Sequence, residues 1–268
     1  MPEGHTLHRL ARDLNRAFAG TVVEVTSPQG RFAESAALLN QTQLAAATAH
    51  GKHLFLLFSE DRWLHVHLGL IGSFILSPPG PPRGEVRLRI RSADTVADLR
   101  GPQLCVLRNR DEVAAQMALL GPDPLRTDAD PDVAWARIHR SGRPIGALLM
   151  DQSVLSGVGN VYRAEVLFRN RLDPHRPGNQ IRRSSWEAIW SDLLALMPQG
   201  VLDGRIDTVR PEHTAEAMGR PPRQDAHGGE VYVYRRAGML CWLCGSRIRT
   251  EVLAGRNLFW CGRCQRRR

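Results

Sequence analysis

Four cysteines near the end of this 268-residue chain constrain its fold more than any other feature. They form two Cys-x2-Cys pairs, Cys241 with Cys244 and Cys261 with Cys264, with 16 residues between the pairs. Paired motifs separated by roughly 15–20 residues are typical of zinc sites. Each pair presents two thiolates to one tetrahedral Zn²⁺, and the chain between them must leave and return, which suits a two-stranded ribbon. We therefore predict a zinc ribbon over 231–268 that holds one structural Zn²⁺.

The alternative for these cysteines is two disulfides or two redox pairs. No apolar run reaches the ~18 residues of a membrane span, and the N-terminal MPEGHTLHRL lacks an apolar signal core. We therefore expect no membrane association and a cytoplasmic protein, in a compartment that disfavours structural disulfides. The fifth cysteine, Cys105, stands in the apolar stretch LCVL and is predicted to be a buried structural thiol.

The charge is unevenly distributed along the chain. Residues 1–134 carry 14 basic and 15 acidic residues, whereas residues 135–268 carry 22 and 12. Such a basic half favours a polyanionic partner, with nucleic acid the first candidate. The alternative is that an arginine-rich composition reflects biased codons, because Lys52 is the single lysine beside 35 arginines.

The first part of the chain, 1–125, is predicted to be a β-rich domain fronted by a helix. Residues 6–19 have an amphipathic helical pattern, with Thr6 as the N-cap. Its apolar face consists of Leu7, Leu10, Ala11, Leu14 and Phe18. From 21 to about 110 the strand period of two dominates, as in 86–91, whose arginines share one face. We expect an α+β protein whose N-terminal domain is a β-sandwich.

The pattern then becomes helical, with 121–132 as a linker and 133–230 as the second domain. Pro144 suits the start of a helix running IGALLMDQ. Ser184 opens another helix with a capping-box spacing. The broad apolar face of that helix consists of Trp186, Ile189, Trp190, Leu193, Leu194 and Met197. The segment 210–230 is predicted to be a long mobile loop.

Two local features could carry chemistry. The turn SGVGN at 156–160 precedes a helix, so its backbone N–H groups and the Asn160 side chain could bind a phosphate. Removal of Met1 would expose Pro2, whose secondary amine is a free base in useful amount near neutral pH and forms a cationic iminium with an aldehyde. Glu3 beside it could act as a general acid or base. Taken alone, such a turn is more often only a turn, and such an N-terminus is more often only a chain start.

Five segments in register with the four cysteines resemble one family over essentially the whole chain. They are PEG at 2–4, GKHL at 51–54, HLG at 67–69, DQ and GVGNVY within 151–162, and GRNLFWC with the final Cys-Gln within 255–265. In order and spacing they resemble the formamidopyrimidine-DNA glycosylase/endonuclease VIII family. The resemblance implies a β-sandwich, a helix-two-turn-helix domain and a zinc finger, and a DNA-repair enzyme that flips a damaged base out of the duplex.

The resemblance also implies roles for individual residues. In the family the N-terminal proline, here Pro2, attacks C1′ of the damaged nucleoside, and the adjacent glutamate, Glu3, donates the proton that opens the sugar ring. The lysine matching Lys52 assists base release and β-elimination. The arginine matching Arg256, at the finger tip, clamps the flanking phosphates and is assigned to δ-elimination.

Two further positions follow from the same register. Asn160 matches the asparagine that holds a phosphate, and Leu70 matches the residue that fills the void left by the flipped base, an apolar wedge of the kind that kinks DNA. The resemblance implies double-stranded damaged DNA as the partner and a monomer that needs no redox or nucleotide cofactor. The chain departs from the family at Thr6, where members often have a second glutamate.

The expected reaction is excision of oxidised bases, pyrimidines favoured, followed by β,δ-elimination. The start MPEG resembles the endonuclease VIII branch, in particular that of high-GC bacteria, whereas HLGL resembles the formamidopyrimidine branch. One alternative is therefore an enzyme specific for 8-oxoguanine and formamidopyrimidines. The other is a damaged-DNA-binding relative without catalysis, which would have no reason to keep Pro2, Glu3 and Lys52 together.

Overall fold

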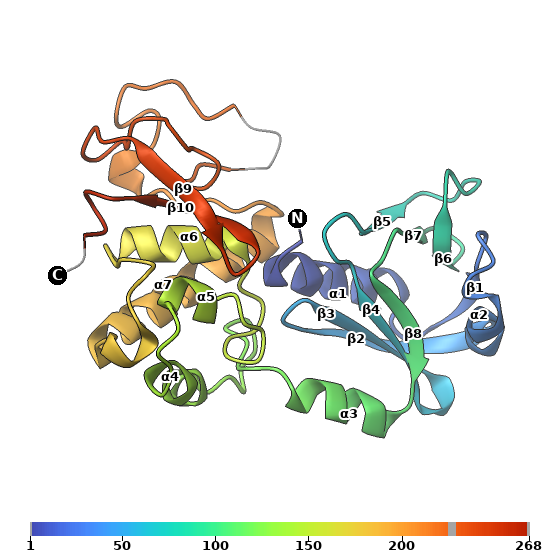
Figure 1. Cartoon of the computed structure of the whole chain (residues 1–268). Helices are drawn as coiled ribbons and strands as arrows, with labels where there is room; N and C mark the ends of the chain where they lie inside the picture. Colours follow the sequence, from blue (N-terminus) through green and yellow to red (C-terminus); the bar gives the residue numbers. More distant parts are fainter. Residues whose placement is uncertain (1, 225–228, 267–268) are drawn as a thin grey trace. The chain divides into compact units, whose positions relative to one another are not determined.

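The computed structural model describes residues 2–224 and 229–266 and divides the chain into two compact units, 1–119 and 120–268 (Figure 1). Unit 1 is built on antiparallel strands that follow one another in the order β5-β7-β6-β1-β2-β3-β4-β8. Its strands are β1 (Thr21–Thr26), β2 (Thr42–His50), β3 (His53–Phe58), β4 (Arg62–His67), β5 (Ser73–Ser77), β6 (Val86–Arg91), β7 (Val96–Arg100) and β8 (Leu104–Arg108).

Strand β1 joins two sheets, because each half of it has a different partner. Thr21–Val23 pair with β2, and Glu24–Thr26 pair with β6. Side chains from both sheets enter one apolar cluster. The α+β class is confirmed, and the predicted sandwich has the form of two sheets connected through one shared strand.

Helix α1 (Gly4–Phe18) packs its apolar stripe into this cluster. Leu7, Leu14 and Phe18 are fully buried, which confirms the predicted face. The prediction that Thr6 is the N-cap is wrong: Glu3 is the N-cap residue, and the Thr6 N–H donates to the Glu3 carbonyl at 2.9 Å. Because Gly4 and His5 are themselves buried, tertiary packing extends the helix before Thr6.

Two helices of unit 1 were not predicted: one lies within the stretch expected to be strands, and the other lies between that stretch and the predicted linker. Helix α2 (Ala33–Leu39) follows β1, and helix α3 (Arg110–Ala118) follows β8. Helix α3 begins with a capping box, in which Asn109 and Glu112 each accept a hydrogen bond from the other's backbone N–H. That signal is readable in the sequence, whereas α2 has no side-chain cap.

A buried ion-pair cluster holds the loop between β5 and β6. Arg89 donates to both oxygens of Asp98 at 2.7 and 2.9 Å, and Arg100 donates to the same carboxylate at 2.8 Å. The two arginines also donate to the carbonyls of Gly80 and Arg83. Burial raises the pKa of the Asp98 carboxyl, but the hydrogen bonds and charges of the arginines outweigh burial and hold this pKa below its ordinary value.

Unit 2 contains the helices α4 (Pro131–His139), α5 (Ile145–Leu148), α6 (Asn160–Arg169) and α7 (Arg183–Asp203) and the hairpin β9 (Ile248–Leu253) and β10 (Arg256–Cys261). Three details differ from prediction. Helix α5 has four residues, because the chain turns after Leu148. Helix α7 begins at Arg183 with Arg182 as N-cap and no side-chain cap, so Ser184 forms no capping box. Leu194 is largely exposed, while the rest of that apolar face is buried.

Segment 210–230 has little regular structure in its described part, apart from a 3-10 turn at Pro211–His213. It is nevertheless held in place at several points. Arg220 forms a salt bridge with Glu230, and the Arg223 backbone N–H donates to the same carboxylate at 2.6 Å. The predicted mobility of residues 225–228 lies outside the described residues. Across the described ranges, no helix is long and apolar enough to cross a membrane.

Asp98→Asn should lower the free energy of unfolding by about 3 kcal/mol near neutral pH, because it leaves a buried guanidinium without its counter-charge. Since the folded-state pKa of Asp98 is depressed, its stabilisation is present above the ordinary carboxyl pKa and is lost as the pH falls through the folded value. Urea unfolding should therefore show a difference in the free energy of unfolding between the wild type and Asp98→Asn that is smaller at acidic pH than at pH 7. The control Glu24→Gln, in an exposed pair with Arg91, should change stability by less than about 1 kcal/mol.

Candidate functional site

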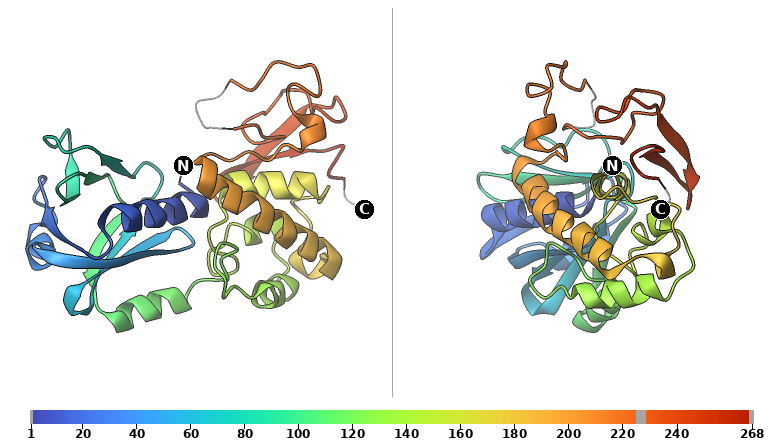
Figure 2. Two further views of the ribbon diagram at one scale, coloured as in Figure 1. Left: turned by 180° about the vertical axis from the view of Figure 1, so that it is seen from behind. Right: turned by 90° about the vertical axis from the view of Figure 1, so that its left-hand side faces the viewer.

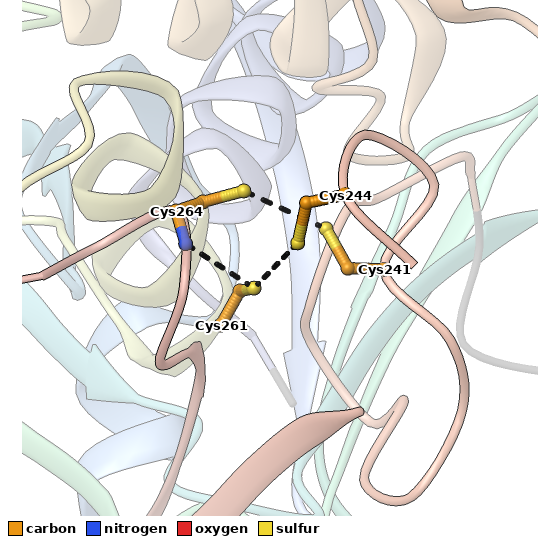
Figure 3. Close-up of side chains that lie close together, drawn as sticks. All are labelled: Cys241, Cys244, Cys261 and Cys264. Carbon is orange, nitrogen blue, oxygen red and sulfur yellow. Dashed lines mark hydrogen bonds between the residues drawn. The ribbon is translucent and has the colours of Figure 1, made fainter. Parts of the chain in front are cut away.

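The four predicted zinc ligands lie together at the base of the β9–β10 hairpin (Figure 3). Their sulfurs are all within 4.8 Å of one another, with Cys241 and Cys264 3.9 Å apart and Cys244 and Cys261 3.4 Å apart. A tetrahedral Zn²⁺ with bonds of ~2.3 Å places its sulfurs about 3.8 Å apart. The set therefore fits one zinc ion, and with four thiolates it leaves no position open for water, so the metal is structural.

The finger is tied to the helices of unit 2 by buried polar groups. The Gln265 amide accepts from the Cys261 backbone N–H at 2.9 Å and donates to the Leu172 carbonyl at 3.0 Å. The carboxylate of Glu165, on α6, accepts from the backbone N–H groups of Tyr232, Val233 and Tyr234 and from the Thr208 hydroxyl. Glu165 was not singled out in the sequence, since its partners lie more than 40 residues away.

The tip of the hairpin brings together two residues predicted to contact DNA. Arg256 is exposed at the start of β10, after the turn at Gly255. Asn160, the first residue of α6, is buried, and its amide donates to the carbonyl of Asn257 at 2.9 Å. Arg163 donates to the Asn160 side chain. Asn160 thus joins α6 to the strand that carries Arg256, while its predicted phosphate contact stays a prediction.

In unit 1, Pro2 and Glu3 stand at the N-terminal end of α1, where Glu3 has no exposed surface. Helix α1 runs antiparallel to β2: Gly20 N–H donates to Leu44, and Asn15 exchanges two hydrogen bonds with Ala47. From Asn15 back to Glu3 the helix spans about 18 Å at ~1.5 Å per residue. The segment from Ala47 to Lys52, which is the end of β2 and the turn after it, covers a similar distance at ~3.3 Å per residue.

Both views of the ribbon agree with this estimate, since the β2–β3 turn lies at the same end of the sheet as the start of α1 (Figures 1 and 2). Lys52 occupies that turn after Gly51, which has a φ of 59°. Burial first, and then the positive charge of Lys52, lower the pKa of His67 on the neighbouring β4. Pro2, Glu3 and Lys52 are therefore brought to one end of unit 1.

The loop after β4 presents apolar side chains to solvent. Leu70 is half exposed, and Ile71 next to it is 90% exposed. A Cβ at Gly72 would lie 2.2 Å from the Leu68 carbonyl oxygen, so only glycine fits this tight turn. Ile71 was missed in the sequence, although two adjacent aliphatic residues between glycines are a readable sign of an exposed apolar tip.

His65 and His67 pack and form hydrogen bonds, and His53 joins them. His53 Nδ1 lies 2.8 Å from His65 Nε2, and the His67 Nδ1 accepts from the Gly69 N–H. Cys105 is buried, and burial raises the pKa of its thiol to about 12, which confirms a structural thiol. Met1, whose removal is predicted, lies outside the described residues.

Three family models match successive parts of the chain: the formamidopyrimidine-DNA glycosylase N-terminal domain over 1–104, its H2TH domain over 120–211, and a zinc finger found in FPG and IleRS over 241–267. Endonuclease 8 1 of Mycobacterium tuberculosis is 53% identical in an alignment of 271 positions, which covers 99% of this chain and 100% of the relative. The chain belongs to the formamidopyrimidine-DNA glycosylase/endonuclease 8 family. It is a DNA glycosylase of base excision repair, as the resemblance predicts, and DNA is its partner.

Further family members extend the likeness to both branches. Probable endonuclease 8 2 of Streptomyces coelicolor is 30% identical, covering 99% of this chain and 94% of the relative. The Lactococcus lactis Fpg, solved as a complex with DNA containing an abasic site, has a TM-score of 0.79 at 23% identity and covers 99% of this chain and 100% of its own. That structure confirms the fold of this glycosylase.

Zinc removal should destabilise the hairpin of this glycosylase and abolish tight DNA binding, because the four thiolates lose the ion that joins the two Cys-x2-Cys pairs. We expect one zinc per chain in metal analysis of the purified protein. Cys244→Ser should lose the metal and DNA affinity in a fluorescence binding assay. The control Cys105→Ala should keep one zinc per chain; loss of zinc in that variant would contradict the assignment of the four ligands.

Proposed function

We propose that this glycosylase is bifunctional: it excises oxidised bases, pyrimidines favoured, through a Schiff base on Pro2 and then cuts the strand. The observation that carries the proposal is that Pro2, Glu3 and Lys52 lie at the same end of unit 1, where α1 begins and β2 ends. The full-length likeness to endonuclease 8 1 supports it. A relative that only bound damaged DNA would have no use for this set.

Base release begins when the Pro2 nitrogen attacks C1′ and the bond from C1′ to the base breaks. The base leaves with the electron pair and takes up a proton, a step that Lys52 assists. The Pro2 nitrogen, now bonded to C1′, gives up its own N–H proton and so regains a lone pair. Glu3 then protonates O4′ as the C1′–O4′ bond breaks and the sugar ring opens, and the nitrogen lone pair forms the C1′ iminium. The secondary amine makes this iminium cationic without a further proton, so it is a strong electron sink.

Strand cleavage follows from the same iminium. It acidifies the C2′ proton, whose loss expels the 3′ phosphate by β-elimination with Lys52 assisting. A second elimination removes the C4′ proton and expels the 5′ phosphate, and Arg256 is the residue that we assign to this step. The guanidinium is permanently charged and can hold the leaving phosphate by two parallel hydrogen bonds.

Groups of both units would bind the DNA. Arg256 and the N-terminus of α6 at Asn160 would hold phosphates. Leu70, with Ile71, would fill the space left by the flipped base. The zinc, held by the four cysteines, would stabilise the hairpin that carries Arg256 and takes no part in the chemistry. We also propose that the protein is cytoplasmic and acts as a monomer, and that the three predicted domains describe its organisation.

Borohydride should trap a covalent adduct between this protein and duplex DNA containing an oxidised base, because the iminium is reducible. Pro2→Gly should lower the trapped fraction about 100-fold, since it replaces the positioned secondary amine with a primary amine, whose imine becomes cationic only by taking up a further proton. Denaturing gels with labelled DNA measure it. A Pro2→Gly protein that traps as well as the wild type would overturn the Schiff base, and binding without any adduct would favour the non-catalytic alternative.

Lys52→Arg should keep DNA binding and lose most base excision. Arginine preserves the charge but cannot exchange a proton at accessible pH, whereas proton transfer contributes about 10²–10⁴-fold to rates. Single-turnover excision and equilibrium binding on the same duplex separate the two effects. A variant that excises at the wild-type rate would remove Lys52 from the proton transfers.

The pyrimidine preference is tested with thymine glycol and 8-oxoguanine duplexes of identical sequence. We expect the larger single-turnover rate constant on thymine glycol. An equal or larger rate constant on 8-oxoguanine opposite cytosine would favour the purine-specific alternative, which the HLGL segment at 67–70 supports.

A further inference from the structure

One face of the sheet in unit 1 carries polar rings that the proposed chemistry leaves unused. His53 begins β3 opposite His67 on β4, and His65 pairs with Phe55. Because side chains alternate between the two faces of a strand, these four residues share a face. The other face, with Leu54 and its neighbours, belongs to the apolar core that contains α1. The imidazoles therefore lie outside that core, on the opposite side of the sheet.

Arg108, on β8, connects this face to the edge of the sheet. Its Nε lies 3.0 Å from His65 Nδ1, and His65 Nε2 lies 2.8 Å from His53 Nδ1. The Phe55 ring stacks on His65 with centroids 4.6 Å apart, and His65 has no exposed surface. Three strands thus contribute one continuous hydrogen-bonded row, Arg108–His65–His53.

Both imidazoles in the row are neutral. Burial, with the positive charges of its neighbours, lowers the pKa of His53 to about 3 and that of His65 to about 4. The Arg108 guanidinium can only donate, so His65 Nδ1 is an acceptor. The single proton of His65 is then on Nε2, where it donates to His53 Nδ1. Both hydrogen bonds of the row therefore point the same way: Arg108 donates to His65, and His65 donates to His53.

The row ends beside the turn that carries Lys52. His53 is the next residue in the chain, and Gly51 on the other side has a positive φ. The His53 and His67 rings are 4.9 Å apart, and His67 Nδ1 accepts from the Gly69 N–H in the loop of Leu70. The hydrogen bond from the His65 side chain thus holds His53, the residue at which the chain leaves the turn and enters β3.

We propose that the Arg108–His65–His53 row is a positioning device for Lys52, and that it sets the rate of base excision without taking part in the attack of Pro2. The inference rests on the proposed function of Lys52. A displacement of about 1 Å at a reacting group can cost about 100-fold in rate. Loss of the row should therefore resemble Lys52→Arg in excision and leave Schiff-base formation by Pro2 at a preformed abasic site intact.

Two substitutions of His53 separate the row from other roles of the ring. In His53→Asn the amide oxygen stands near the place of Nδ1 and can still accept from His65. In His53→Gln the amide reaches the place of Nε2 instead, so the His65 N–H loses its acceptor. We expect His53→Gln, and likewise His65→Phe, to slow single-turnover excision about 10- to 100-fold, with His53→Asn restoring most of the rate.

The matched readout is borohydride trapping on duplex with a preformed abasic site, which needs Pro2 but no base release. We expect the trapped fraction to change less than about twofold in every row variant, since the nucleophile is untouched. The excision substrate is whichever of the thymine glycol and 8-oxoguanine duplexes the wild type cuts faster. Ile90→Val, a buried change on β6 in the same unit, controls for lost stability and should leave the ratio of excision to trapping unchanged.

Each other outcome overturns the inference. A His53→Asn variant that is slow while His53→Gln is fast would show that the ring acts through Nε2. Equal excision in all variants, or parallel loss of excision and trapping, would reduce the row to ordinary packing. A wild-type protein that traps no adduct would contradict the proposed function itself, whereas a trapping wild type with an unaltered ratio in His53→Gln contradicts the positioning role alone.

Discussion

The antiparallel packing of α1 along β2 is the contact on which the geometry of unit 1 depends. The apolar stripe of the helix supplies the burial, but apolar contact alone would allow the helix to slide. Asn15 prevents this sliding, because its side chain both donates to and accepts from the backbone of Ala47. With that register set, the N-terminus of α1 can lie only at the end of β2 where Lys52 stands. The placement of Pro2 is therefore a consequence of core packing.

In unit 2 polar groups and metal add to apolar packing. Ile248 and Phe259 of the hairpin enter an apolar cluster with α6. Beside it, four thiolates close the base of the hairpin, the Glu165 carboxylate accepts from three successive backbone N–H groups, and the Gln265 amide bridges to Leu172. Such buried polar groups are stabilising only when fully paired. The exposed position of Arg256 thus depends on contacts formed far from it.

Sequence reasoning succeeded where the signal is local. The α1 face, strand 86–91, the helix after the 156–160 turn and the finger all follow from period or spacing and are found in the structure. It failed at helix starts, since Thr6 and Ser184 have capping residue types but lie inside helices that packing extends. It could not find the His53–His65–Arg108 row or the bond from Asn160 to Asn257, because those partners are distant in the chain and depend on strand order.

The arginine-rich composition also has a different meaning once the side chains are placed. Part of the positive charge of unit 2 is internal: Arg163 and Arg236 are buried, and Arg220 stacks on Trp242 while paired with Glu230. The basic surface open to DNA is therefore smaller than the net charge implies. Arginine suits these sites, as Arg108 suits its hydrogen bond to His65, because a guanidinium stays charged and always donates. Proton transfer, by contrast, needs a side chain that can release its proton. Lys52, the only lysine in the sequence, has such a side chain.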